Sequence, residues 1–101
     1  MSKYAMDSTT EVRSPIFERR RLRRIRMIVE LTLNLIGSDM TVSHREARCL
    51  VRCARKAILD LHPSFEERYE RIVRPHFERI LCSRWPAEET LHNTAAAELV
   101  N

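Results

Sequence analysis

The chain contains a single glycine, Gly37, in 101 residues, and this scarcity limits the folds that are open to it. A sheet protein of this size needs several tight turns, which depend on glycine, asparagine or aspartate. Apolar residues make up 44% of the chain and charged residues 32%, a composition that supplies a core. The length suits one domain. We therefore expect one all-α domain.

The apolar spacing predicts a first helix over residues 14–36. Ser14 and Pro15 are typical of an N-cap followed by the first helical position, and Gly37 is placed to cap the other end. One side of the helix carries an apolar stripe, which consists of Leu22, Ile25, Val29, Leu33 and Ile36. The opposite side carries a narrow polar stripe, which consists of Arg19, Arg23, Arg26, Glu30 and Asn34.

A competing period lies inside the same segment. Residues 29–35 alternate between apolar and polar side chains, as a half-exposed strand does. A strand followed by two helices is the element order of ribbon-helix-helix DNA-binding dimers, and the chain resembles them in that order alone. No second run alternates in this way, and leucine favours helix, so we prefer the helical interpretation.

A second helix is predicted over residues 43–61. Ser43 and Glu46 have the spacing of a capping box at its start. Its apolar stripe is rich in alanine, which permits neighbouring helices to approach closely. The stripe consists of Ala47, Leu50, Val51, Ala54, Ala57, Ile58 and Leu61.

A third helix is predicted over residues 64–84, where Ser64 and Glu67 have the spacing of a second capping box. Its apolar stripe continues in phase past Pro75, so we expect one helix that is kinked there. The stripe consists of Phe65, Tyr69, Ile72, Val73, Phe77, Ile80 and Leu81. Short connections favour antiparallel neighbours, which predicts a compact antiparallel three-helix bundle over residues 14–85.

Two segments are expected to lie outside the bundle. Residues 1–13 are polar and aperiodic, which is typical of a disordered leader. Residues 86–101 are acidic and rich in alanine, and we expect a flexible tail with at most one marginal turn of helix.

The residues that carry chemistry form no catalytic or metal-binding pattern. Cys49 and Cys53 are four residues apart, but Cys82 and the histidines supply no further paired ligand spacing. We expect Cys53 to fill space beside the apolar stripe and Cys49 to be an exposed thiol. No glycine-rich phosphate loop, nucleophile elbow or HExxH-type motif occurs. His44 and His62 are expected to be caps or solvated side chains, so we predict no enzyme activity, metal, cofactor or small-molecule substrate.

The sequence also bears on the compartment. The longest apolar run, residues 27–36, already contains Glu30, Thr32 and Asn34, whereas a membrane span needs about 20 apolar residues. The arginines come too late for a secretory signal. Three cysteines are an odd number and are read as reduced thiols. We therefore expect a cytoplasmic protein that does not enter a membrane.

The far half of the first helix carries more apolar surface than two neighbouring helices can cover. Met27, Leu31 and Leu35 lie on a different side from the main stripe, so apolar surface there spans about three quarters of the circumference. A second copy of the chain is the most economical cover. We expect a homodimer that buries these three residues, and the alternative is a different protein partner on the same face.

An arginine-rich segment precedes this face. The net charge from Arg13 to Arg26 is +6, from seven arginines and Glu18. Five arginines share the outward side of the helix, an electrostatic footprint that suits a phosphate backbone. They are Arg19, Arg20, Arg23, Arg24 and Arg26. The alternative is a solvated face, or one paired with the acidic residues Glu88 and Glu89.

Two functions follow from these features. The excess of apolar surface without a chemical motif favours a small helical protein–protein interaction or regulatory protein without catalytic activity. The alternative is a DNA- or RNA-binding protein that uses the arginine-rich face of the first helix.

Overall fold

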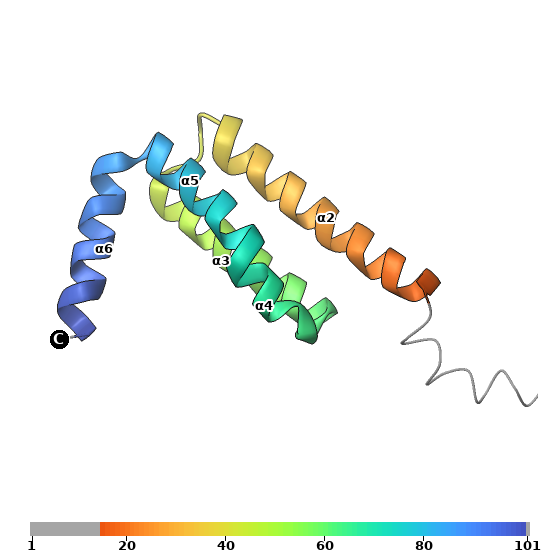
Figure 1. Cartoon of the computed structure of the whole chain (residues 1–101). Helices are drawn as coiled ribbons and strands as arrows, with labels where there is room; N and C mark the ends of the chain where they lie inside the picture. The colour runs from red at the N-terminus through yellow and green to blue at the C-terminus, as the bar shows by residue number, and fades with distance from the viewer. Residues whose placement is uncertain (1–14, 101) are drawn as a thin grey trace, which may run out of the picture.

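The computed structural model describes residues 15–100, with side chains for residues 15–94, so the predicted leader and the Ser14 cap lie outside the described residues. Figure 1 shows the helices. The elements in chain order are α2 (Pro15–Ser38), α3 (His44–Leu61), the 3-10 turn η1 (Pro63–Phe65), α4 (Glu66–Arg68), the π turn η2 (Tyr69–Val73), α5 (Arg74–Arg84) and α6 (Pro86–Val100). We call the segment from η1 to α5 the third helical run.

The first three helical runs lie antiparallel to their neighbours, and α2 forms one edge of the assembly (Figure 1). The second of them, α3, packs against α2, while the third run packs on both. The described residues contain no strand, which confirms the predicted all-α class. The alternating segment 29–35 lies inside α2, so the strand interpretation and its ribbon-helix-helix order are wrong.

The core lies where these three runs meet. Its apolar members all belong to the stripes predicted from the helical spacing. They are Ile25 and Ile36 of α2, Ala47, Ala54 and Ile58 of α3, and Phe65, Tyr69, Val73, Phe77 and Leu81 of the third run. Ile72 was expected among them but is 53% exposed. It lies within the π turn, where the 3.6-residue period on which the prediction rests does not hold.

The chain forms four helical runs over residues 15–100, so the prediction of a three-helix fold is wrong. The additional helix is α6, in a segment expected to form at most one turn. Pro86 occupies the first turn, where its missing N–H costs nothing. Glu88 and Glu89 in the same turn complement the positive end of the helix dipole. The sequence prediction rested on the low stability of a short isolated helix. It did not include the contacts that Glu89 makes with α3, because they join residues distant in sequence.

The start of α3 is the predicted capping box. The Ser43 hydroxyl accepts from the Glu46 backbone N–H at 3.2 Å, and the Glu46 carboxylate accepts from the Ser43 backbone N–H at 3.0 Å. The second predicted capping box, at Ser64, is wrong. Ser64 lies inside η1 and its hydroxyl bonds the ring of His62 at 3.1 Å instead.

The third helical run passes Pro75 without a break. The π turn η2 comes directly before the proline, and the Arg74 backbone N–H donates to the Tyr69 carbonyl five residues earlier. Proline cannot donate a backbone hydrogen bond, and its ring clashes with the carbonyl four residues earlier in a regular α-helix. The wider turn is the local irregularity that accompanies the proline in this structure.

The end of α2 differs from the expectation. Gly37 lies within the helix and has no positive φ, so it is not the left-handed cap that the sequence predicts. Arg84 of α5 serves this end instead and donates to the carbonyls of Ile36 at 2.7 Å and Asp39 at 3.0 Å. Its guanidinium also stacks over the Trp85 ring, 4.3 Å from the centroid. The bond to Ile36 satisfies a carbonyl of the last turn, whereas the Asp39 carbonyl lies beyond the helix and also accepts from the Val42 backbone N–H at 3.3 Å.

We predict that Gly37→Ala stabilises the protein. A Cβ atom at Gly37 would lie 3.8 Å from Ile80 Cδ1, an ordinary van der Waals contact. Alanine restricts the unfolded chain and favours helix, so the free energy of unfolding should rise by about 0.5 to 1 kcal/mol. Urea denaturation followed by circular dichroism measures the change. A lower midpoint than that of the wild type would show that this position needs glycine.

Candidate interaction groove

An apolar groove of about 720 Å³ runs between α2 and α3. We call it the α2–α3 groove. Its lining comes mainly from the outer side of α2, with two residues from the last turns of α3. The α2 residues are Arg24, Met27, Ile28, Glu30, Leu31 and Asn34, and the α3 residues are Ala57 and Leu61.

The groove contains two of the three residues predicted to form the interaction face. Met27 and Leu31 are each 62% exposed and line it. Leu35 is half-buried and does not line it. The structure therefore joins Met27 and Leu31 in one surface but does not bring Leu35 to it.

Sequence reasoning missed the α3 side of the groove. Ala57 and Leu61 belong to the predicted apolar stripe of the second helix and were assigned to the core. Ala57 is exposed and Leu61 is half-buried. They lie at the end of α3 near the first half of α2, where the stripe of α3 extends beyond the core. The helical period alone does not indicate where along a stripe the packing ends.

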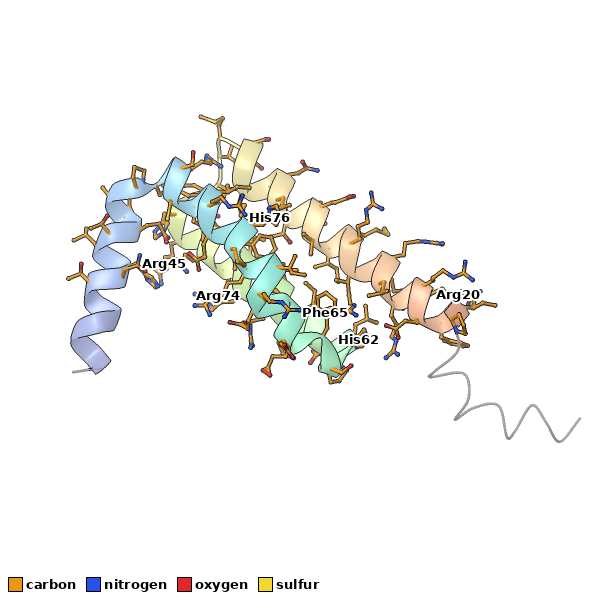
Figure 2. All side chains as sticks on the ribbon, viewed as in Figure 1. Arg20, Arg45, His62, Phe65, Arg74 and His76 are labelled. Atoms are coloured by element: carbon orange, nitrogen blue, oxygen red, sulfur yellow. The ribbon has the colours of Figure 1, made fainter. Side chains whose placement is uncertain are left out.

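All five arginines predicted on the outer side of α2 are exposed. Arg19, Arg20 and Arg23 line a hollow of about 290 Å³ with Ile16 near the start of the helix. Figure 2 labels Arg20 at this end of the molecule. Arg24 lies on the α2–α3 groove. Arg26 is paired with Glu30 at 2.9 Å, so it is the one of the five that has an acidic partner within the described part of the chain.

Glu89 of α6 does not neutralise this face. Glu89 is buried, with 2% of its side chain exposed, and accepts from Arg48 and His44 of α3. Burial raises the pKa of Glu89, but the hydrogen bonds from Arg48 and His44 outweigh it and hold the pKa below its usual range. The predicted alternative, in which the α2 arginines pair with this carboxylate, is therefore wrong for Glu89.

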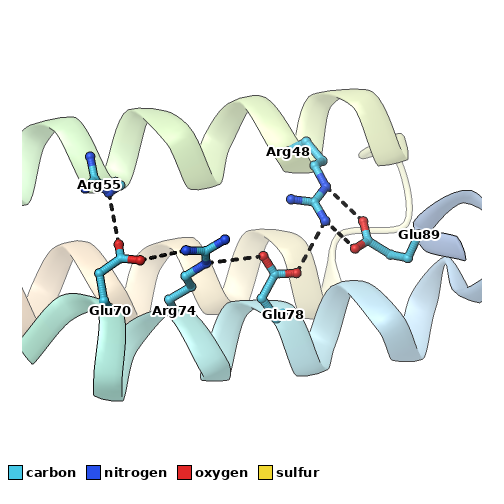
Figure 3. A network of polar contacts seen from close by, with 6 residues as sticks. All are labelled: Arg48, Arg55, Glu70, Arg74, Glu78 and Glu89. Atoms are coloured by element: carbon cyan, nitrogen blue, oxygen red, sulfur yellow. Dashed lines mark hydrogen bonds and ion pairs between the residues drawn. The ribbon is translucent and has the colours of Figure 1, made fainter. Parts of the chain in front are cut away.

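The Arg48–Glu89 pair ends a chain of charges between α3 and the third run (Figure 3). Glu78 lies 3.3 Å from Arg48 and 3.9 Å from Arg74. Glu70 lies 2.6 Å from Arg74 and 3.2 Å from Arg55. Hydrogen bonds from these arginines hold the pKa of Glu70 below its usual range, despite partial desolvation. Arg48, Arg55 and Arg74 are each paired with a glutamate in this network, unlike Arg19, Arg20 and Arg23 at the start of α2.

A second polar contact, which is partly buried, ties the start of α2 to the turn after α3. His62 is buried, and its Nε2 lies 2.8 Å from the Glu18 carboxylate. The hydrogen bond with His62 lowers the pKa of Glu18. His62 and Phe65 lie side by side at this end of the third run (Figure 2). His62 is the C-cap of α3, which is one of the two expected roles, and its backbone N–H donates to the Ile58 carbonyl. Neither His44 nor His62 is a solvated side chain, because each bonds a carboxylate more than 40 residues away.

The described residues offer no metal site, since no three His, Cys, Asp or Glu side chains are grouped to hold an ion. Cys49, Cys53 and Cys82 are all exposed free thiols. The expectation that Cys53 fills space in the interior is wrong, because the side of α3 on which it lies faces solvent. Within residues 15–100 no helix combines the length and apolar character needed to cross a membrane.

Comparison with known proteins finds no family model, no curated protein and no solved structure that matches this chain.

We predict that Glu89→Gln destabilises the protein by about 2 kcal/mol at neutral pH, because it weakens charge-assisted hydrogen bonds to a buried carboxylate. The pKa of Glu89 is lowered by folding, so its contribution is present above the usual glutamate pKa of about 4.3 and is lost as the pH falls through the folded value. Urea denaturation between pH 7 and pH 3 should therefore show a smaller loss of stability on acidification for the variant than for the wild type.

The matched control is Glu88→Gln. Glu88 is the preceding residue of α6 and is exposed. This substitution removes the same charge and should change the free energy of unfolding by less than about 0.5 kcal/mol. Equal effects of the two substitutions would contradict an anchoring role for Glu89.

Proposed function

We propose that this chain is a small, non-catalytic protein of the cytoplasm that acts through protein–protein contacts, and that it forms a homodimer at the α2–α3 groove. The observation that carries the proposal is the position of Met27 and Leu31, two large and mostly exposed apolar side chains in one groove wall. Contiguous apolar surface of this kind is typical of a contact site in a protein without chemical motifs.

The energetics favour covering this surface. Complete burial of a leucine or methionine side chain contributes about 1.5 to 3 kcal/mol. A symmetric contact buries each residue twice, so Met27 and Leu31 together supply four side chains to one dimer. This gain offsets part of the entropic cost of association, and contacts around the two residues must supply the rest.

The polar residues of the groove favour a second copy of the chain as the partner. The lining includes one cation, Arg24, and one anion, Glu30. In a two-fold symmetric contact the same patch meets itself. A patch with only one sign of charge would then repel itself, whereas a patch with both signs can place opposite charges near each other. A lining of one sign would instead favour a partner of opposite charge.

We predict that Leu31→Glu disrupts the dimer. Each dimer loses two leucines, worth about 1.5 kcal/mol each, so the dissociation constant should rise at least about 100-fold. Sedimentation equilibrium of the wild type and the variant, at concentrations from about 1 to about 100 µM, measures the dissociation constant. A wild-type chain that is monomeric throughout this range would contradict the proposed dimer.

Leu91→Glu is the matched control. Leu91 lies on α6, away from the groove, and is 71% exposed. The substitution makes the same chemical change at a similar exposure, so it should leave the dissociation constant unchanged. Equal weakening by both variants would indicate an effect of net charge rather than of the groove.

A second candidate function is the binding of DNA or RNA by the arginines at the start of α2. The observation that favours it is that Arg19, Arg20 and Arg23 surround one hollow and have no acidic partner among the described residues. Arginine without a competing carboxylate is available for phosphate oxygens. Binding of this kind depends on the charge of the backbone rather than on base sequence.

We predict that replacing Arg19, Arg20 and Arg23 with glutamine flattens the salt dependence of nucleic-acid binding. Each phosphate contact contributes about 0.9 to the slope of log K against log salt concentration on duplex DNA, so the slope should fall by about three per chain. Fluorescence anisotropy with a labelled DNA duplex and a structured RNA, between about 50 and 200 mM salt, measures the slope.

The control replaces three arginines elsewhere. Arg45 and Arg52 of α3 and Arg79 of α5 are exposed and have no ion pair within the described residues. Their replacement by glutamine makes the same change in net charge and should leave the slope nearly unchanged. Absence of binding by the wild type to both probes at low salt would reject this candidate function.

A further inference from the structure

The outer side of α2 has a second period that the apolar stripes did not reveal. Four residues that line the α2–α3 groove, Arg24, Met27, Leu31 and Asn34, follow one another at spacings of three, four and three. The same spacing continues to Arg20 before them and to Ser38 after them, and all six side chains are exposed. Residues at alternating spacings of three and four share one face of a helix, as the residues of a coiled-coil seam do, and on this face Met27 and Leu31 are the apolar pair at the centre.

This seam lies opposite the buried side of α2. The residues that α2 contributes to the interior are Ile25, Thr32 and Ile36, and none belongs to the seam. Because α2 is the edge helix of the assembly, no described helix covers its outer side (Figure 1). The helix thus has one side packed in the fold and another that is spaced to meet a helix.

We propose that a second copy of the chain packs on this seam through its own α2, antiparallel, with the two-fold axis between Met27 and Leu31. The inference rests on the proposed homodimer and adds its geometry. In this arrangement Met27 of each copy lies opposite Leu31 of the other. The two pairs form an apolar centre, next to Ile28 and the α3 wall of the groove.

The charges of the seam decide the orientation. A parallel pair places Arg20 against Arg20 and Arg24 against Arg24, and directly opposed like charges are destabilising. The antiparallel pair places Arg24 opposite Asn34 and Arg20 opposite Ser38. The arginine-rich ends of the two copies then lie at opposite ends of the dimer.

The same residues decide the register. A shift of seven residues in one direction places Met27 opposite Ser38 and Leu31 opposite Asn34. A shift in the other direction places Met27 opposite Arg24 and Leu31 opposite Arg20. Both shifts separate the apolar pairs and bury polar groups against them, which is how polar seam positions fix the register of a coiled coil.

Distance measurements between spin labels test the orientation. Cys49, Cys53 and Cys82 are exposed, so serine can replace them, and one new cysteine is then introduced as Arg20→Cys or Asn34→Cys. With a rise of 1.5 Å per residue, the antiparallel register separates the two labels along the helix axis by about 27 Å at position 20 and about 15 Å at position 34. A parallel pair gives about 10 Å at both positions.

A label-free experiment tests the same contact. Met27→Lys and Leu31→Glu should each weaken self-association. Mixing the two variants should restore a dimer, because Lys and Glu then meet across one of the two contacts while the other contact stays apolar. In a parallel pair each charge would face an unchanged Met27 or Leu31, so mixing would relieve the like-charge repulsion within each variant but would form no Lys–Glu contact, and the recovery would be smaller.

The outcomes separate this inference from the proposed function. A wild-type monomer would reject the proposed homodimer and the seam with it. A dimer with equal short distances at both positions would reject the antiparallel orientation alone. A dimer that Leu31→Glu leaves intact, with long distances at both positions, would place the contact on another face. The two expected distances together with rescue on mixing would support the proposal.

Discussion

The aromatic core side chains of this fold enter from one helical run, and the arrangement of the other helices depends on this. Phe65, Tyr69 and Phe77 of the third run fill the space that α3 leaves with its alanines. The rings of Tyr69 and Phe77 are tilted, with centroids 6.4 Å apart, and burial raises the pKa of the Tyr69 hydroxyl to about 12. The stripe that α2 buries faces α3 and the third run. The opposite side of α2 therefore keeps Met27 and Leu31 at the surface.

Charge is distributed unevenly between the same elements. The arginines of α3 and α5 that face each other are neutralised by glutamates, as in the pairs that Glu70 and Glu78 make with their neighbours. The start of α2 has arginines without such glutamates, apart from the pairs of Glu18 and Glu30. The positive charge of the chain is thereby concentrated beside its exposed apolar groove. A surface of this kind attracts both anions and apolar groups. The proposed dimer depends on the apolar groups, and the proposed nucleic-acid binding depends on the arginines.

The helical period was sufficient to predict the class, the first three helical segments and the members of the core, because burial selects residues at fixed spacing along each helix. It failed where the contact joins residues distant in sequence. Glu89 reads as one more acid of a tail, yet it is buried against Arg48 and His44. Gly37 reads as a cap, yet Arg84 takes that role from 47 residues away. Met27 and Leu31 were predicted as an exposed face from spacing, whereas the α3 wall beside them depends on how far α3 packs along α2, which the spacing does not specify.

The Arg84 contact also bears on how the molecule opens. A helix that ends in solvent frays from its last turn without disturbing the rest of the fold. Here the carbonyls of Ile36 and Asp39 accept hydrogen bonds from Arg84 of α5. The Arg84 guanidinium also stacks on Trp85, the residue between α5 and α6. Loss of the last turn of α2 therefore releases a side chain of another helix. We therefore expect the end of α2 and the end of α5 to open together, so that amide hydrogens of that turn exchange with solvent through a larger opening than end fraying.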